Sequence, residues 1–141
     1  MALTQVYGLI GSPVGHTLGP IMHDTAFKEL GLNCIYHAFS VGKENAERAI
    51  KGALALGFGG LNVTIPLKEL ALQYITPDTW ARRIGAINTI DSKGNGYNTD
   101  GTGAVRAFIS PALSNIAYLL IVVMMAMAFR QRRRRLTSQG R

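Results

Sequence analysis

The stretch Asn62-Val63-Thr64-Ile65-Pro66-Leu67-Lys68 decides the architecture that we expect for this chain. It follows a glycine-rich approach and reads as the end of a short apolar strand, after which Pro66 is expected to open a helix. Proline suits a first helical position because the N–H there has no partner within the helix. Ligands of open α/β sheets bind at the carboxyl ends of strands. We therefore predict that Asn62, Thr64 and Lys68 converge on a small hydroxylated ligand.

Each of these three residues also has an ordinary structural interpretation. A lysine in a first helical turn is usually a solvated charge. Thr64 has the β-branched side chain that strands favour, and Asn62 is a common turn or cap residue. The spacing alone therefore suggests a site without establishing one.

Composition and charge indicate one globular domain with a neutral body. The chain has 141 residues, of which 48% are hydrophobic, as is usual for a globular protein. A single cysteine, Cys34, excludes an internal disulfide and predicts a reducing, cytoplasmic location. Residues 1–109 carry nine basic and eight acidic side chains, whereas 110–141 carry six arginines and no acid. Because the body has no basic excess, we expect no nucleic-acid binding.

Apolar periodicity predicts strands and helices in alternation. We expect strands at 6–10, 34–39, 60–65 and 86–90, and helices at about 20–30, 45–56, 67–74 and 78–84. This alternation predicts an α/β fold with a mainly parallel sheet and helices on both faces. Turn formers at 92–96 predict a hairpin in which 97–99 returns as one antiparallel strand. A last helix should follow, with Thr99 or Asp100 as its N-cap.

Neither the glycines nor the histidines complete a cofactor or metal motif. Glycines 11, 15 and 19 do not fit G-x-G-x-x-G, and Gly101-Thr102-Gly103 is followed by Arg106 where the third glycine belongs. Histidines 16, 23 and 37 lack the spacing of metal ligands. We therefore predict no cofactor-binding residues and no metal site.

Four blocks of sequence, in order and with similar spacing, resemble the substrate domain of shikimate dehydrogenases. They are GSPVGHTLGP at 11–20, NVTIPLK at 62–68, GAINT at 85–89 and GYNTD at 96–100. The resemblance covers about residues 5–109. It implies NADPH-dependent reduction of 3-dehydroshikimate to shikimate, with the substrate held by this domain and NADP held by a separate Rossmann domain.

The resemblance also implies roles for individual residues. Lys68 and Asp100 would form the catalytic pair, while Thr64 and Asn88 would contact the substrate. The chemistry suits these residue types, because an ammonium stabilises the alkoxide formed at a reduced ketone and delivers a proton to it. A nearby carboxylate keeps that lysine charged. Asp100 would equally serve as a helix N-cap, and one carboxylate can fill both roles.

The first block departs from the family pattern at the substrate carboxylate. Two serines, one residue apart, are usual there, and this chain has Thr17 and Gly19 instead. Thr17 keeps a hydroxyl, whereas Gly19 loses one and is expected to open space. We therefore expect weaker shikimate binding, or tolerance of a relative such as quinate with an extra ring hydroxyl.

The C-terminal part departs further from the family. We assign 1–109 to the substrate-binding domain and 110–141 to an apolar and arginine-rich tail without a Rossmann domain. The run Ile116–Phe129 is shorter than the ~20 residues of a membrane span, but 107–129 contains no charge. Three interpretations stay open, namely a membrane anchor on a non-catalytic binder, a helix packed on the body, and a reading-frame slip in the gene. We favour the slip, which predicts an incomplete enzyme that is inactive alone; the sequence leaves the oligomeric state open.

Overall fold

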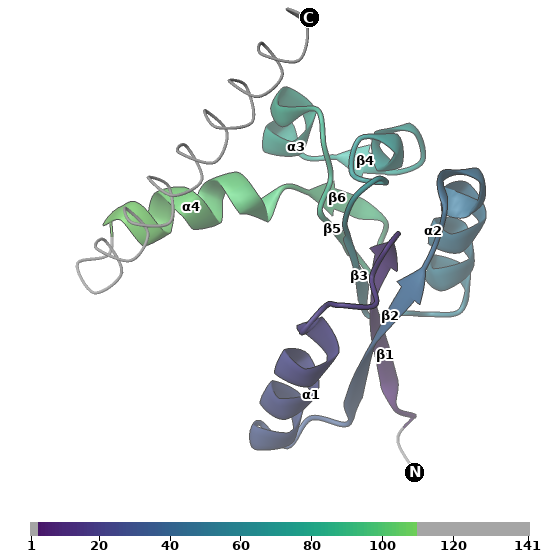
Figure 1. The fold of residues 1–141 in the computed structure, drawn as a ribbon, viewed down its shortest axis with the longest axis vertical. Helices are drawn as coiled ribbons and strands as arrows, with labels where there is room; N and C mark the ends of the chain where they lie inside the picture. The colour runs from purple at the N-terminus through teal and green to yellow at the C-terminus, as the bar shows by residue number, and fades with distance from the viewer. Residues whose placement is uncertain (1–2, 110–141) are drawn as a thin grey trace, which may run out of the picture. The chain divides into compact units, whose positions relative to one another are not determined.

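A computed structural model describes residues 3–109, and the chain divides into two units at 1–99 and 100–141 (Figure 1). The strands are β1 (Gln5–Gly11), β2 (Cys34–Ser40), β3 (Gly60–Val63), β4 (Thr76–Pro77), β5 (Thr89–Asp91) and β6 (Asn95–Tyr97). The α-helices are α1 (Gly19–Glu29), α2 (Ala46–Ala55), α3 (Thr79–Ile84) and α4 (Thr99–Ile109). Two 3₁₀ turns, η1 (Lys43–Asn45) and η2 (Leu70–Gln73), complete the described part.

The strands form one sheet in the order β2-β1-β3-β5-β6-β4. β1 runs parallel to β2 and β3, and β4 runs parallel to β6. β5 is antiparallel to both of its neighbours. The predicted fold class, a mainly parallel sheet with one antiparallel strand, is therefore confirmed.

The predicted hairpin forms, because β5 and β6 pair antiparallel, but the strand that runs against the others is β5 and not the return at 97–99. The reason lies where the chain re-enters the sheet. The Val63 N–H donates to the Asn88 carbonyl over 2.8 Å, so the chain returns beside the carboxyl end of β3. β5 must therefore run away from that end, and β6 then regains the direction of β3.

The predicted helix at 67–74 is wrong in its first half. Residues 65–69 form turns, the Ile65–Pro66 peptide bond is cis, and only η2 is helical. The Lys68 carbonyl accepts a hydrogen bond of 2.8 Å from the Ile87 N–H. Because this long-range bond takes the carbonyl that a helix would use locally, Lys68 lies in a turn and not in a first helical turn.

The two faces of the sheet are covered by different helices, with α1 on one side and α2 on the other (Figure 1). Side chains alternate along a strand, so Ile10, Leu61 and Val63 point toward α2. There they join Ile50 of α2, and all four are at most 3% exposed. The hydrophobic core of the domain therefore lies on the α2 face.

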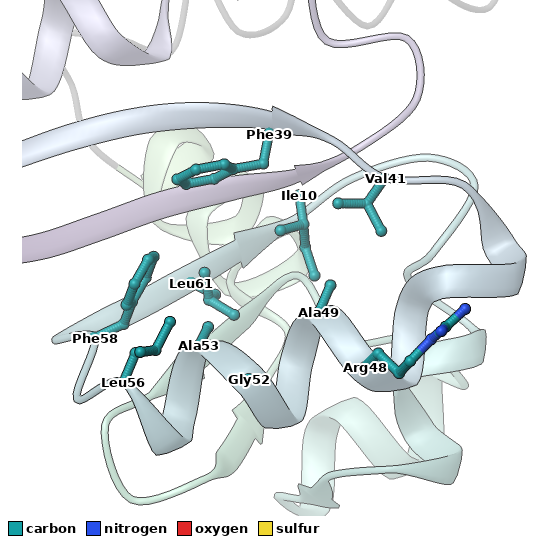
Figure 2. A pocket seen from close by; sticks show the side chains of 10 residues that line it. All are labelled: Ile10, Phe39, Val41, Arg48, Ala49, Gly52, Ala53, Leu56, Phe58 and Leu61. Carbon is teal, nitrogen blue, oxygen red and sulfur yellow. The ribbon is translucent and has the colours of Figure 1, made fainter.

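An apolar cavity of about 260 Å³ opens beside α2 at the margin of this core (Figure 2). Its lining comes from α2 and from the ends of the strands beneath it, and consists of Ile10, Phe39, Val41, Arg48, Ala49, Gly52, Ala53, Leu56, Phe58 and Leu61. The cavity is lined by hydrocarbon apart from the one guanidinium, so it offers little to a polar ligand.

Helix α1 begins and ends where the sequence predicted but contributes no fully buried residue. Gly31, with a positive φ of 63°, ends it, and the Leu32 N–H returns to the Phe27 carbonyl over 2.8 Å in a Schellman arrangement. Ile21 and Met22 are 66% and 63% exposed. This helix therefore covers its face of the sheet only through half-buried side chains, which include His23 and Phe27.

Helix α4 begins at Thr99, and Asp100 lies in its first turn. The predicted N-cap, Thr99 or Asp100, stays a prediction. Within residues 3–109, no helix is long and apolar enough to cross a membrane. The proposed span at 107–129 and the tail from 110 onward lie almost wholly outside the described residues. The domain boundary at 109 stays a prediction.

Candidate functional site

The end of β1 holds Thr64 against the sheet. A Cβ on Gly11 would lie 2.4 Å from the Thr64 Cγ2 and 2.8 Å from the Ile65 carbonyl oxygen, so only glycine allows this approach. The Thr64 N–H donates to the Ile10 carbonyl over 2.9 Å. Thr64 is thus fixed at the carboxyl end of β3, as predicted, with its methyl group packed on Gly11.

Thr17 and Gly19 lie together at the start of α1. The Gly19 N–H donates to the Thr17 Oγ1 over 3.1 Å. A Cβ on Gly19 would lie 3.2 Å from that oxygen and 3.3 Å from the Tyr36 Cε1. The expectation that Gly19 opens space is therefore wrong, because the Thr17 hydroxyl and the Tyr36 ring already fill it.

A chain of polar side chains crosses the α1 face of the sheet, and we call it the amide network. The Tyr36 hydroxyl donates to the Asn62 Oδ1 over 2.7 Å, and the Asn62 Nδ2 lies 3.4 Å from the Thr89 Oγ1. The Thr89 hydroxyl donates to the Asn88 Oδ1 over 2.9 Å. The same oxygen accepts the Thr99 N–H over 2.9 Å, and the Asn88 Nδ2 donates to the Thr99 Oγ1 over 3.0 Å. Asn62 and Asn88, from two of the predicted blocks, thus share one network.

The amide network is connected to the Thr17 loop through His23. The His23 ring stacks on Tyr36 with centroids 4.0 Å apart and planes 6° from parallel. Its Nδ1 lies 2.8 Å from the Gly19 carbonyl oxygen. Burial raises the pKa of Tyr36 to about 12, so its hydroxyl stays protonated and acts as a donor. Loop and network therefore form one hydrogen-bonded and stacked unit.

Two cavities adjoin these residues. One, of about 380 Å³, lies on the α1 face and is lined by His23, Tyr36, Asn62 and Thr89 together with Tyr7, Phe27, Gly59, Gly60, Leu61, Ile90 and Asp91. The other, of about 340 Å³, is lined by Lys43, Ile65, Pro66, Lys68, Glu69 and Ala86. Lys68 is half-buried, and its carbonyl bond to the Ile87 N–H ties it to the segment that carries Asn88. The residues that line this second cavity include two lysines and one glutamate, and this positive excess suits an anionic ligand.

Asp100 belongs to the second unit of the chain. Its pairing with Lys68 therefore stays a prediction. Thr99 ends the first unit, and its hydroxyl oxygen accepts the hydrogen bond from the Asn88 Nδ2 described above.

The first helix N-terminus does not fit a dinucleotide. Pyrophosphate groups bind at helix N-termini through backbone N–H groups. Here the Gly19 N–H already donates to the Thr17 Oγ1, and Pro20 has no N–H. Neither residue therefore offers a backbone N–H to a phosphate. Within residues 3–109, no cluster of three or more His, Cys, Asp or Glu side chains could hold a metal ion.

Sequence reasoning missed Tyr36, His23 and Thr89. The spacing of His23 only argues against a metal ligand, and Tyr36 lies within a predicted strand without a motif around it. The available signal was chemical, because a buried tyrosine hydroxyl needs a partner, and the block residue Asn62 lies near it in the sheet. Tyr36 is 6% exposed and carries that hydroxyl into the amide network.

Comparison with known proteins places these residues in a family context. Residues 9–90 match a family model described as the shikimate dehydrogenase substrate binding domain. A shikimate dehydrogenase (NADP(+)) of Methanosarcina mazei is 55% identical over 113 residues, which cover 76% of this chain and 40% of that protein. The Bacillus cereus enzyme of the same name is 47% identical over 112 residues, with shares of 77% and 40%.

Solved structures agree with the sequence comparison. The crystal structure of a shikimate 5-dehydrogenase from Listeria monocytogenes, in complex with shikimate and NAD, superposes with a TM-score of 0.71 at 38% identity. The match covers 74% of this chain and 38% of that one. The chain thus spans about 40% of the length of the curated relatives that it matches.

Proposed function

The chain belongs to the shikimate dehydrogenase family through its substrate-binding domain, and from this premise we propose that it binds shikimate and 3-dehydroshikimate. Thr17, Thr64 and Asn88 would contact the ligand, with Gly19 shaping the site of its carboxylate. The observation that carries this proposal is the amide network, which gathers hydroxyl and amide groups from separate blocks of sequence. Such groups match the ring hydroxyls of a small carbocyclic acid.

Lys68 and Asp100 are proposed as the catalytic pair of the family reaction. The half-buried ammonium of Lys68 would donate a hydrogen bond to the ketone oxygen, and then a proton, as negative charge develops there. Asp100 would hold that ammonium in place and in its charged form. The hydride itself comes from NADPH in this family. The described residues offer no dinucleotide cradle at α1, so we propose that this chain supplies the substrate half of the reaction and does not turn over alone.

The proposal is tested by titrating shikimate into the 141-residue chain and following ¹⁵N–¹H NMR shifts. We expect saturable binding that Thr64→Val weakens by about tenfold, the usual effect of losing one hydrogen bond to a charged or strongly polar group. Valine retains the methyl that packs on Gly11. Thr25→Val is the matched control. Thr25 is exposed on α1, and its hydroxyl donates to the Ile21 carbonyl within the same helix.

Two outcomes would contradict the proposal. No saturable shift up to about 10 mM shikimate, which corresponds to binding weaker than roughly −3 kcal/mol, would remove the binding function. Tight NADPH binding in a parallel titration would overturn the division of labour between this chain and a cofactor-binding partner. The cytoplasmic location stays a prediction, and recovery of the expressed chain in the soluble fraction would support it.

A further inference from the structure

We propose that Tyr36 is a positioning residue for ligand binding, whose hydroxyl holds the Asn62 side-chain amide in one of its two orientations. The inference rests on the proposed function, because Asn62 lies in the same site. It deepens that function by assigning a role to a residue outside the four sequence blocks.

The Thr99 N–H, at one end of the amide network, fixes the donor and acceptor of the bonds that lead from it to Tyr36. The Thr99 N–H can only donate, so the atom of Asn88 that lies 2.9 Å away must be the oxygen. The Thr89 hydroxyl, 2.9 Å from the same oxygen, then donates to it. The lone pairs of Thr89 therefore face the Asn62 Nδ2. This leaves the Asn62 oxygen toward Tyr36, which must donate.

Tyr36, at the other end of the network, holds the Asn62 amide in this orientation. Its bond to Asn62 is the shortest in the network, at 2.7 Å, whereas the next bond, from the Asn62 Nδ2 to Thr89, is 3.4 Å. Without the phenol, the Asn62 amide would be held only by that long contact. A flipped amide would present an oxygen to Thr89 and compete with Asn88 for the Thr89 proton. The Tyr36 hydroxyl thus keeps an N–H donor of Asn62 on the side where Asn88 lies.

The ring that carries the hydroxyl is itself fixed. It stacks on His23, which contacts the Gly19 carbonyl, and it lies against the space beside Gly19. Tyr36 is 6% exposed on β2. Movement of the phenol would therefore disturb both Asn62 and the loop that carries Thr17 and Gly19. One side chain thus connects these two parts of the proposed site.

Tyr36 acts through Asn62 and not on the ligand. A phenol has one proton, and the structure uses it in the bond to the Asn62 Oδ1. The Tyr36 hydroxyl therefore has no proton left to donate to a ligand carboxylate. Loss of the hydroxyl should therefore weaken binding only while the Asn62 amide is present.

The test measures the Kd of shikimate for the 141-residue chain carrying Tyr36→Phe, which removes the hydroxyl and keeps the ring that stacks on His23. We expect binding to weaken by about five- to tenfold. Tyr97→Phe is the matched control, since it removes a hydroxyl that donates to the Asp91 Oδ2 over 3.1 Å, and its Kd should stay within about twofold. In an Asn62→Ala background, Tyr36→Phe should cause no further loss, because coupled residues are not additive.

The outcomes separate this inference from the proposed function. If the unmodified chain binds shikimate and Tyr36→Phe binds as Tyr97→Phe does, the positioning role is wrong while the binding function stands. A full additional loss in the Asn62→Ala background overturns it as well. If the unmodified chain does not bind, both proposals fail together.

Two further measurements cover a Tyr36→Phe variant that fails to fold. Asn62→Asp keeps an acceptor for the phenol but has no N–H donor, so binding equal to that of the unmodified chain would overturn the inference. The side-chain ¹⁵N–¹H₂ resonances of Asn62 report the bond without ligand. We expect a stronger nuclear Overhauser effect from these amide protons to the Thr89 side chain than to the Tyr36 ring, because Nδ2 faces Thr89 and Oδ1 faces Tyr36. The reverse ranking would contradict the proposed orientation of the amide.

Discussion

The two faces of one sheet differ in how their side chains are held. On the α2 face, Ile10, Ile50, Leu61 and Val63 are almost fully buried and interact by packing alone. On the α1 face, half-buried and buried polar side chains are held by hydrogen bonds and ring stacking, and α1 buries no residue completely. Packing is non-directional, whereas hydrogen bonds fix orientation. We infer that the α2 face supplies most of the stability and the α1 face supplies the geometry of a site.

The largest expected effect is on the α2 face. Ile50→Ala should lower the free energy of unfolding by about 3 kcal/mol, since it leaves a cavity at a fully buried position. Urea denaturation followed by circular dichroism would measure it. Ile21→Ala, at a 66% exposed position on α1, is the control and should change stability by less than about 0.5 kcal/mol. Equal losses at the two positions would break the comparison of the faces.

A smaller loss of stability, joined to a loss of binding, is expected on the α1 face. Asn88→Ala removes the acceptor of the Thr89 hydroxyl and the Thr99 N–H, which should cost about 2 kcal/mol because buried donors lose their partners. Shikimate binding should fall by more than tenfold.

Asn98→Ala is the control for this change. Asn98 is equally buried, at 7% exposure, and its Nδ2 donates to the Ala86 carbonyl over 3.0 Å. It should lose stability to a similar extent and, once corrected for the folded fraction, keep its affinity. A parallel loss of affinity in both variants would show that binding follows stability, against our division of roles.

The faces also differ in how far sequence alone predicts them. Apolar periodicity predicted the helix at 45–56, because residues three and four positions apart, such as Ala46, Ile50 and Ala53, lie on one face at successive turns. The structure buries that face. The turn at Lys68 and the direction of β5 were not predictable in this way. They depend on bonds from Lys68 to Ile87 and from Val63 to Asn88, which join residues 19 or more positions apart.

The same limit applies to the candidate site. Thr64, Asn88 and Lys68 could be proposed because they stand within recognisable blocks. Tyr36 could not, since a tyrosine in a strand has the same local pattern whether its hydroxyl is structural or functional. The space beside Gly19 was misjudged for the same reason, because the ring that fills it comes from β2, 17 positions along the chain.

A third prediction tests that filled space. Gly19→Ser should lower the free energy of unfolding by up to about 1 kcal/mol, because the new Cβ requires the Thr17 hydroxyl or the Tyr36 ring to move by a few tenths of an ångström. Gly15→Ser in the same loop is the control, since a Cβ there would meet nothing within 4 Å. If both variants unfold at the same urea concentration, Gly19 has the open space that we first expected.

The smallest effect is expected in the turn that follows β5, where Asp91 lies at the end of the α1-face cavity. Asp91 accepts hydrogen bonds from the Asn95 side chain and from the Asn95 and Lys93 backbone N–H groups, which lower its pKa from 3.8 to about 2. A lowered folded-state pKa stabilises the fold above the unfolded value and loses that contribution as the pH falls through the folded one. Asp91→Asn should therefore lower stability at pH 7 by less than about 1 kcal/mol, given how exposed this turn is.

The difference between Asp91→Asn and the unmodified chain should shrink as the pH falls from 3.8 toward 2, where both chains carry a neutral group at this position. Urea denaturation at several pH values would measure it. Shikimate binding at pH 7 should not change, because the Asp91 oxygens are engaged within the turn and the amide network does not pass through them. A loss of affinity in this variant would extend the site along β5 to the Asp91 end of the α1-face cavity. Asp91 would then contribute to ligand binding as well as to stability.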